Sequence, residues 1–266
     1  MKKAKKILLI ITIILVLGGL IALVVAVSTV HKQTMCKELS INIRYNDADN
    51  FITEKQVRIL AEKTGQFENQ PIDKIDIPAL KKAIEKHPYA AHVDVKTSID
   101  GILRISLEQR EALVRIFNQD GNSFYIDKEG VLLPIINGTA SRLITANGFI
   151  AQQYTEENRF KLADSSTDSL QLASNPLFKV YKLALFINKD DFLKAFVEEI
   201  YINQKNEIEI IPKVGDQIIQ FGDIDRMDEK FTYLKAFYHS NTTKGGWNKY
   251  ATISLKYKNQ IVCSKK

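Results

Sequence analysis

The chain has 266 residues, of which 45% are hydrophobic and 26% are charged, and its formal net charge at pH 7 is +6. No segment is of low complexity and no internal repeat is visible, which excludes a repeat array. Four lysines precede residue 7, and without them 33 basic residues face 31 acidic residues, so the charge does not imply a nucleic-acid partner. Cys36 and Cys263 are too few for a disulfide framework or a metal site. They can form one bridge at most, and we expect two unpaired thiols.

The first predicted element is a transmembrane helix. The run from Ile7 to Val27 carries no charge, and as a helix it reaches roughly 30 Å, the thickness of the hydrocarbon core of a bilayer. We therefore predict a membrane span at residues 7–30 and a cytoplasmic tail at residues 1–6, because lysine-rich flanks stay in the cytoplasm. A cleaved signal peptide is the alternative, but its apolar region is usually only ~7–15 residues long. The rest of the chain is then periplasmic.

Residues 38–109 predict a small α+β domain. A period of two at both ends of this range indicates strands, whereas the middle has helix signals: Thr53 and Gln56 have capping-box spacing, and Pro78 lies in the first turn of a second helix. Asp100-Gly101 predicts a hairpin turn. The expected order is strand, helix, helix, strand, strand, with the elements at residues 39–45, 53–65, 77–88, 91–96 and 103–108.

Residues 110–263 predict a mixed β domain with flanking helices. Asn175 and Pro176 have the residue types of a helix cap and first turn, whereas residues 151–175 are polar and give no assignment. The strands expected from alternation lie at residues 112–117, 123–126, 197–202, 207–211, 217–221, 251–257 and 261–262, with a helix at residues 225–238.

No pattern in the sequence favours an enzyme. The four histidines are scattered and lack the spacing of a zinc site, and no nucleophile elbow or phosphate-binding loop follows a predicted strand. The acidic residues between Asp223 and Glu229 lack the glycine of a calcium loop and suit a helix N-terminus instead. We therefore expect no catalytic residue, no metal and no cofactor.

The order and spacing of many short motifs resemble a known family. The residues concerned are Thr53–Val57, Pro88, Val93, Leu103-Arg104-Ile105, Arg110, Tyr125, Asp127, Gly130, Leu133-Pro134, Gly215, Phe221-Gly222, Glu229-Lys230, Ile253, Leu255, Tyr257, Asn259 and Gln260. Together with the domain order, they resemble the bacterial cell-division family FtsQ/DivIB. The resemblance implies one membrane helix, a POTRA domain and a C-terminal β domain.

Some residues depart from the pattern of that family. Tyr45-Asn46 stands where a glycine is usual, Gln109 replaces a glutamate, and Ala112 replaces a proline. Ser254 and Lys256 replace an aspartate and an arginine that are frequent in the closing strand. The chain is therefore expected to be a divergent member whose partner recognition differs in its chemistry.

The resemblance implies a non-enzymatic scaffold at the division septum that binds the small bitopic proteins FtsB (DivIC-like) and FtsL. The expected mode is strand addition, in which a partner segment pairs with the open edge of a terminal strand. The residues expected to bind the partner are Tyr250, Thr252, Ser254, Lys256 and Tyr257, with Trp247 and Phe237 as aromatic anchors.

Two other functions remain open from the sequence. A membrane-anchored cell-envelope enzyme would need a concave site with converging titratable groups. A POTRA-type translocation or assembly component would explain residues 39–108 equally well, but it would leave the closing strand pair unexplained.

Overall fold

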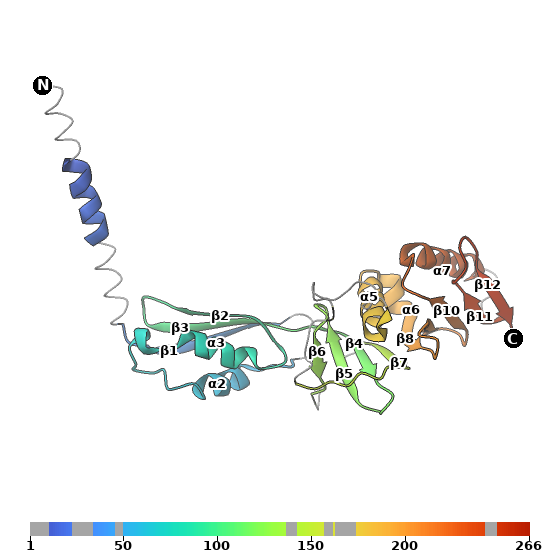
Figure 1. Cartoon of the computed structure of the whole chain (residues 1–266), viewed down its shortest axis with the longest axis horizontal. Coiled ribbons are helices and arrows are strands. Elements are labelled where there is room, and N and C mark those ends of the chain that lie inside the picture. The colour runs from blue at the N-terminus through green and yellow to red at the C-terminus, as the bar shows by residue number, and fades with distance from the viewer. Residues whose placement is uncertain are drawn as a thin grey trace, which may run out of the picture. The chain divides into compact units, whose positions relative to one another are not determined.

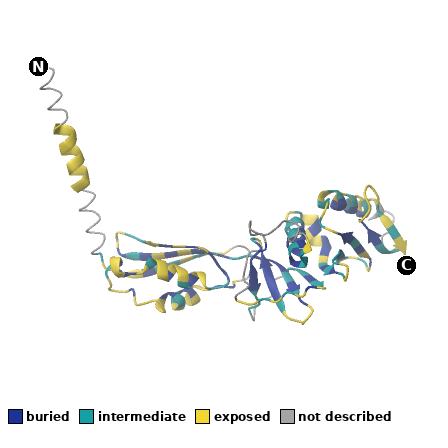
Figure 2. Ribbon diagram, viewed as in Figure 1, coloured by how far each residue is buried: buried dark blue, intermediate teal, exposed yellow. Residues whose placement is uncertain are grey.

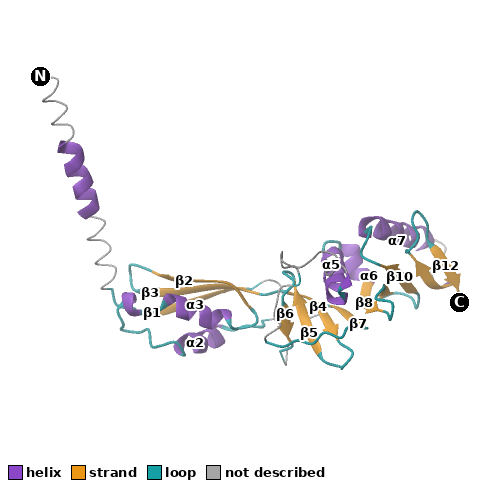
Figure 3. Cartoon of the chain, viewed as in Figure 1, coloured by secondary structure: helices purple, strands orange, loops and turns teal. Residues whose placement is uncertain are grey.

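The structure, a computed structural model, describes residues 11–22, 34–45, 50–136, 143–156, 162, 174–242 and 249–266. The chain divides into two compact units, the first formed by Met1–Asn46 with Ile52–Gln109 and the second by Asp47–Phe51 with Arg110–Lys266. Both mix helices and strands, which confirms the predicted α+β class (Figure 3). The domain limits predicted from the sequence, 38–109 and 110–263, stay predictions.

Of the predicted span at residues 7–30, the structure describes residues 11–22. These twelve residues are helical, and their side chains are exposed (Figure 2). Among the described helices, none combines the length and the apolar character that crossing a bilayer requires.

The first unit is a three-stranded sheet with two helices, in the order that the sequence predicts. The strand order is β1-β3-β2, with β1 parallel to β3 and β2 antiparallel to β3. A short 3-10 turn, which the sequence did not predict, precedes the second helix. The elements are β1 (Glu38–Arg44), α2 (Glu54–Glu62), η1 (Ile72–Lys74), α3 (Ile77–Glu85), β2 (Ala90–Thr97) and β3 (Ile102–Gln109).

Local signals set the ends of both helices. The Thr53 hydroxyl accepts the backbone N–H of Gln56, and the Gln56 side chain accepts the backbone N–H of Thr53 at 2.8 Å, which completes the predicted capping box. Asp76 caps α3 by accepting the N–H of Ala79 at 2.9 Å. The buried faces, Val57 and Ala61 on α2 with Leu80 and Ile84 on α3, then close the core of this unit.

The second unit is built on one nine-stranded sheet with the order β12-β11-β10-β9-β8-β7-β4-β5-β6. Three neighbouring pairs, β4 with β7, β7 with β8 and β10 with β11, are parallel, and the others are antiparallel. The strands are β4 (Ala112–Phe117), β5 (Ser123–Asp127), β6 (Leu132–Pro134), β7 (Ile144–Gly148), β8 (Val197–Ile202), β9 (Ile208–Pro212), β10 (Ile218–Gly222), β11 (Tyr250–Ser254) and β12 (Val262–Lys265); the helices are α5 (Pro176–Asn188), α6 (Asp191–Phe196) and α7 (Met227–Thr242) (Figure 1).

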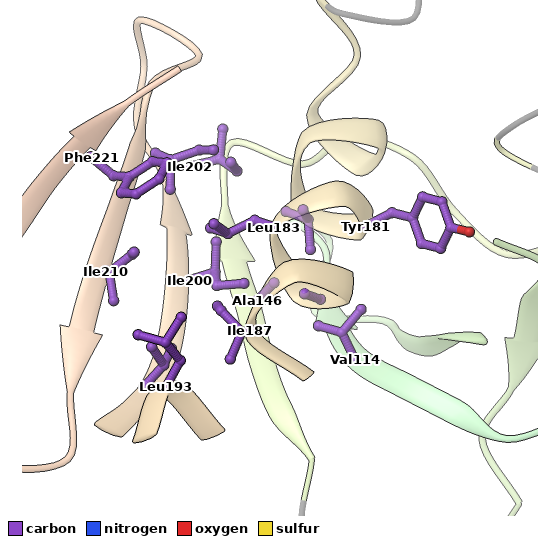
Figure 4. Close-up of a cluster of buried hydrophobic side chains, with 14 of the residues drawn as sticks. Val114, Ala146, Tyr181, Leu183, Ile187, Leu193, Ile200, Ile202, Ile210 and Phe221 are labelled. Carbon is purple, nitrogen blue, oxygen red and sulfur yellow. The ribbon is translucent and has the colours of Figure 1, made fainter. Parts of the chain in front are cut away.

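One face of this sheet is apolar from end to end. Register pairs join one residue of every strand into a single row, and residues in direct register point to the same face. Helices cover this face: Leu183 and Ile187 of α5 and Leu193 of α6 pack against Ala146, Ile200 and Ile210 of the row (Figure 4). The row runs Pro134, Phe124, Ile116, Ala146, Ile200, Ile210, Ile219, Ile253, Cys263.

The opposite face carries a mostly polar row, formed by sequence neighbours of the residues in the apolar row. This row runs Asn147, Tyr201, Glu209, Gln220, Ser254, Val262 across β7 to β12. One face of the sheet is therefore apolar and covered by helices. The other face is mostly polar from β7 to β12, and we call it the open face.

Three elements of this unit escaped the sequence analysis, among them the three-residue strand β6. Strand β7 contains only one fully buried residue, Ala146, so alternation gives it no signal. Helix α6 is only six residues long; it begins after its Asp190 cap, and its last residue, Phe196, leads directly into β8. Strand β7 and helix α6 lie beside the core, where tertiary packing decides the local structure.

Candidate partner-binding site

The sheet of the second unit ends, on its C-terminal side, at β12. Within the described sheet, β12 pairs with β11 alone, so the other side of its backbone faces no strand. Its four residues are exposed or half-buried, and Val262 is 45% exposed. Such an edge presents the N–H and C=O groups to which a partner strand can bind.

The structure places three of the predicted site residues on β11, one strand in from this edge. Tyr250, Thr252 and Ser254 lie between β10 and β12 in the sheet. Strand order is not visible in the sequence, which is why residues of β12 itself were missed. Val262, Ser264 and Lys265 of β12 are exposed. A strand of four residues is too short for an alternating pattern of apolar and polar residues to reveal them.

Tyr250 and Phe237 belong to the helix-covered face. Their rings lie 5.8 Å apart, the Phe237 ring also meets Tyr238 edge-on at 5.7 Å, and both residues pack against the main core. A register shift between Tyr250 and Thr252 turns Tyr250 to the same side as Ile253. These two aromatic side chains therefore pack on the helix-covered side of β11.

Thr252 and Ser254 differ in how their hydroxyls are satisfied. The Thr252 hydroxyl shares a 2.6 Å hydrogen bond with that of Ser264, directly across from it on β12. The Ser254 side chain is buried, and its hydroxyl has no hydrogen-bond partner among the described residues. Thr252 thus ties the edge strand to the sheet.

Lys256 is engaged within the chain. Its ammonium group donates to both carboxylate oxygens of Glu207, at 2.7 and 2.8 Å, and this hydrogen bond lowers the pKa of Glu207. Its side chain also lies against Gly222, where an added Cβ would approach the Lys256 Cγ to 3.0 Å. Tyr257, the next residue, is 53% exposed. Trp247 lies outside the described residues.

Lys256 and Glu207 lie at a polar groove on the open face. The groove has a volume of about 420 Å³, and its lining residues come from β8, β9, β10, the β8–β9 turn and the residues that follow β7 and β11. Tyr201, Glu209 and Gln220 of the polar row form its floor. The groove lies on the β8–β10 side of β11, and Lys256, which follows β11, lines it.

The acidic residues after β10 bind lysines of the same unit. Asp223 accepts Lys230 Nζ through its carbonyl at 2.6 Å, and its carboxylate lies 3.3 Å from Lys179 Nζ. Asp225 binds Lys230 Nζ at 2.7 Å, and Lys230 is only 2% exposed. These ion pairs fix the loop that leads into α7, in agreement with the structural role that the sequence favours.

Both cysteines are free: Cys36 is buried and Cys263 is half-buried on β12.

Both units match known protein families. A family described as FtsQ/DivIB, C-terminal related, matches residues 111–264, and a POTRA-like domain matches residues 34–108. The chain belongs to the FtsQ/DivIB-related family. A comparison with curated proteins finds no match to the chain.

The family assignment has direct consequences. The domains of this family imply a scaffold role in cell division. The family consists of non-enzymatic division proteins that are associated with the septal membrane. The predicted POTRA-like domain and its strand-helix-helix-strand-strand order are confirmed.

Proposed function

We propose that this FtsQ/DivIB-related protein is a membrane-anchored, non-enzymatic scaffold of the division machinery. In this proposal it holds small bitopic division proteins of the FtsB (DivIC-like) and FtsL type by strand addition to β12. Residues 7–30 anchor it in the cytoplasmic membrane, with the bulk of the chain on the periplasmic side.

The observation that carries the proposal is the open edge of β12 at the end of a two-sided sheet. A partner strand added there extends the apolar row at Cys263 and the polar row at Val262 without rearranging the unit. Backbone hydrogen bonds supply affinity in this mode, and side chains at alternate positions supply selectivity. Tyr250, Thr252, Ser254, Lys256 and Tyr257, together with Phe237 and Trp247, remain the proposed binding residues behind this edge.

Photo-crosslinking tests the position of the partner. A photoreactive residue replaces Val262 in one variant and Val214 in another, and each full-length variant is co-expressed with a DivIC-like and an FtsL-like protein. The two valines are matched, at 45% and 54% exposed, but Val214 lies in the β9–β10 turn. We expect crosslinks to the small division proteins at position 262 and none at position 214.

Hydrogen exchange tests the mode. Strand addition should slow exchange of backbone amides in residues 262–265 when the partner is present, because their outward groups become hydrogen-bonded. Crosslinks at position 262 without slower exchange would mean that side chains, and not the strand edge, hold the partner. Equal crosslinking at both positions would contradict the site itself.

A further inference from the structure

The residues that enter the first unit are bound to two of its loops. The backbone N–H of Cys36 donates to the carbonyl of Gln70 at 2.8 Å, and that of Ile72 donates to the carbonyl of Thr34 at 3.0 Å. The N–H of Lys37 donates to the carbonyl of Gly101, at the tip of the β2–β3 hairpin, at 2.8 Å. The entry of the chain and the hairpin tip therefore lie at the same end of this unit (Figure 1).

The hairpin tip presents an isoleucine to solvent. Ile99 is 70% exposed, the largest exposed fraction of any large hydrophobic side chain in the described part of the chain. Met35, at the same end, is 50% exposed. A single exposed isoleucine needs no explanation, but two exposed apolar side chains at the end where the chain enters the unit mark a candidate contact site.

Several contacts hold the tip rigid. The N–H of Gly101 donates to the carbonyl of Ser98 at 3.1 Å, and the Ser98 hydroxyl donates to the carboxylate of Asp100 at 2.6 Å. Gly101 has a φ of +89°, and a Cβ at this position would collide with the carbonyl oxygen of Met35. These contacts hold the turn in the conformation that leaves Ile99 exposed to solvent.

The chain length between this end and the predicted span is short. Seven residue steps separate Val27, the last residue of the apolar run, from Thr34, so an extended chain reaches at most roughly 25 Å. The headgroup layer of a bilayer occupies several ångströms of that distance. The end of the unit that carries Ile99 and Met35 is therefore tethered close to the lipid surface.

We propose that the β2–β3 hairpin tip is a lipid-contact site, in which Ile99 and Met35 enter the interface of the bilayer that anchors the chain. This inference rests on the membrane anchor in the proposed function. The tether gives the tip a high effective concentration at the surface, so burial of one or two apolar side chains is enough to bias the orientation of the unit.

The charges around the tip determine how deep it inserts and which lipids it needs. Lys37 and Arg104 lie near Asp100, and the hydrogen bond from Ser98 lowers the pKa of Asp100, so this carboxylate stays ionised. An ionised carboxylate keeps the tip at headgroup depth. Because charges of both signs meet here, the contact does not depend on anionic lipid.

Fluorescence of the full-length chain in phosphatidylcholine vesicles tests the site. In a Cys263→Ser background, Ile99→Cys carries an environment-sensitive label, and Ser106→Cys, exposed and four residues further along β3 than Ile102, carries the same label as a control. We expect a blue shift at position 99 and quenching by nitroxides on the lipid, with neither at position 106. The Cys263→Ser parent, treated with the same label, shows whether the buried Cys36 reacts.

A second pair of variants removes the isoleucine without labelling it. With the label at Met35→Cys, Ile99→Asp should reduce the lipid-quenched fraction, with about a tenfold change in the docking equilibrium. Ile59→Asp is the matched control, because Ile59 is 44% exposed on α2 and lies outside the tip. The signal should persist at high salt, since it depends on apolar burial.

The outcomes separate this inference from the anchor. A chain that floats with vesicles but shows the same emission at positions 99 and 106 overturns the lipid contact and leaves the anchor intact. A shift at position 99 that needs added division proteins assigns the tip to a protein partner and also overturns it. A chain that does not float overturns both.

Discussion

The two edge strands of the nine-stranded sheet, β6 and β12, differ in how readily they can pair with a further strand. At one end β6 has three residues, two of them fully buried, and it closes with Pro134, which has no backbone N–H to offer. At the other end β12 has four exposed or half-buried residues and no proline. One sheet therefore has an edge protected against pairing and an edge available for it, and the proposed partner strand belongs at the second.

The β6 end is also the more strongly bonded. The buried Asp127 carboxylate accepts the N–H groups of Glu129 and Val131 at 2.9 and 2.7 Å and binds Arg110 at 2.9 Å. Burial raises the pKa of Asp127, and the bonds to Val131 and Arg110 oppose that rise. The Tyr181 hydroxyl, from α5, donates to the Lys128 carbonyl in the same turn. These bonds stabilise the β6 end of the sheet.

The largest expected effect follows from that contrast. Asp127→Ala should lower the free energy of unfolding by about 3–5 kcal/mol, because it leaves two backbone N–H groups without their acceptor and takes one of two carboxylate partners from the mostly buried guanidinium of Arg110. Chemical denaturation of the full chain in detergent measures it. Glu129→Ala, whose carboxylate is 39% exposed, is the control and should lose less than about 1 kcal/mol. Equal losses would remove the distinction between the ends.

The next effect is on binding. Ser264→Pro removes one N–H of β12 and should weaken capture of the small division proteins by about tenfold or more, or about 1.4 kcal/mol. Pro134→Ala, at the protected edge, should leave capture unchanged. The measurement is co-purification from membranes at graded partner levels. Unchanged capture by the Ser264→Pro variant, with the unit still folded, would rule out strand addition at β12.

A smaller effect separates the two roles of Lys256. Lys256→Glu places two carboxylates together, and the exchange with Glu207→Lys restores the ion pair with its charges reversed. We expect the single variant to lose about 0.5–1 kcal/mol of stability and the exchange variant to recover most of it. If Lys256 contacts the partner, capture stays weakened in both. Recovery of capture along with stability would make Lys256 a purely structural residue.

The smallest effect is the pH dependence of this pair. Because Lys256 lowers the pKa of Glu207 below its ordinary value of 4.5, the pair stabilises the folded state above that value and loses this contribution as pH falls through the lower, folded pKa. The coupling energy from the double-mutant cycle should be about 0.5 kcal/mol at pH 7 and should fall toward zero as acid protonates Glu207 in the folded chain. A coupling energy that does not change with pH would contradict the carboxylate–ammonium assignment.

The sequence alone determined the elements that depend on near neighbours. The capping box at Thr53 and Gln56 and the Asn175–Pro176 start of α5 each involve residues a few positions apart, so their chemistry can be read directly. The alternation in β8 and β9 likewise predicted strands whose buried faces the structure confirms. Residue order and spacing also identified the family before any coordinates.

Only the tertiary structure decided which strand forms the edge. Residues 251–257 and 261–262 were both expected as closing strands, but the parallel pairing of β10 with β11 joins residues more than thirty positions apart. Such pairing depends on packing across the whole sheet, which no local pattern records. The same reason hid β7, whose position between β4 and β8 comes from the core that forms around Ala146.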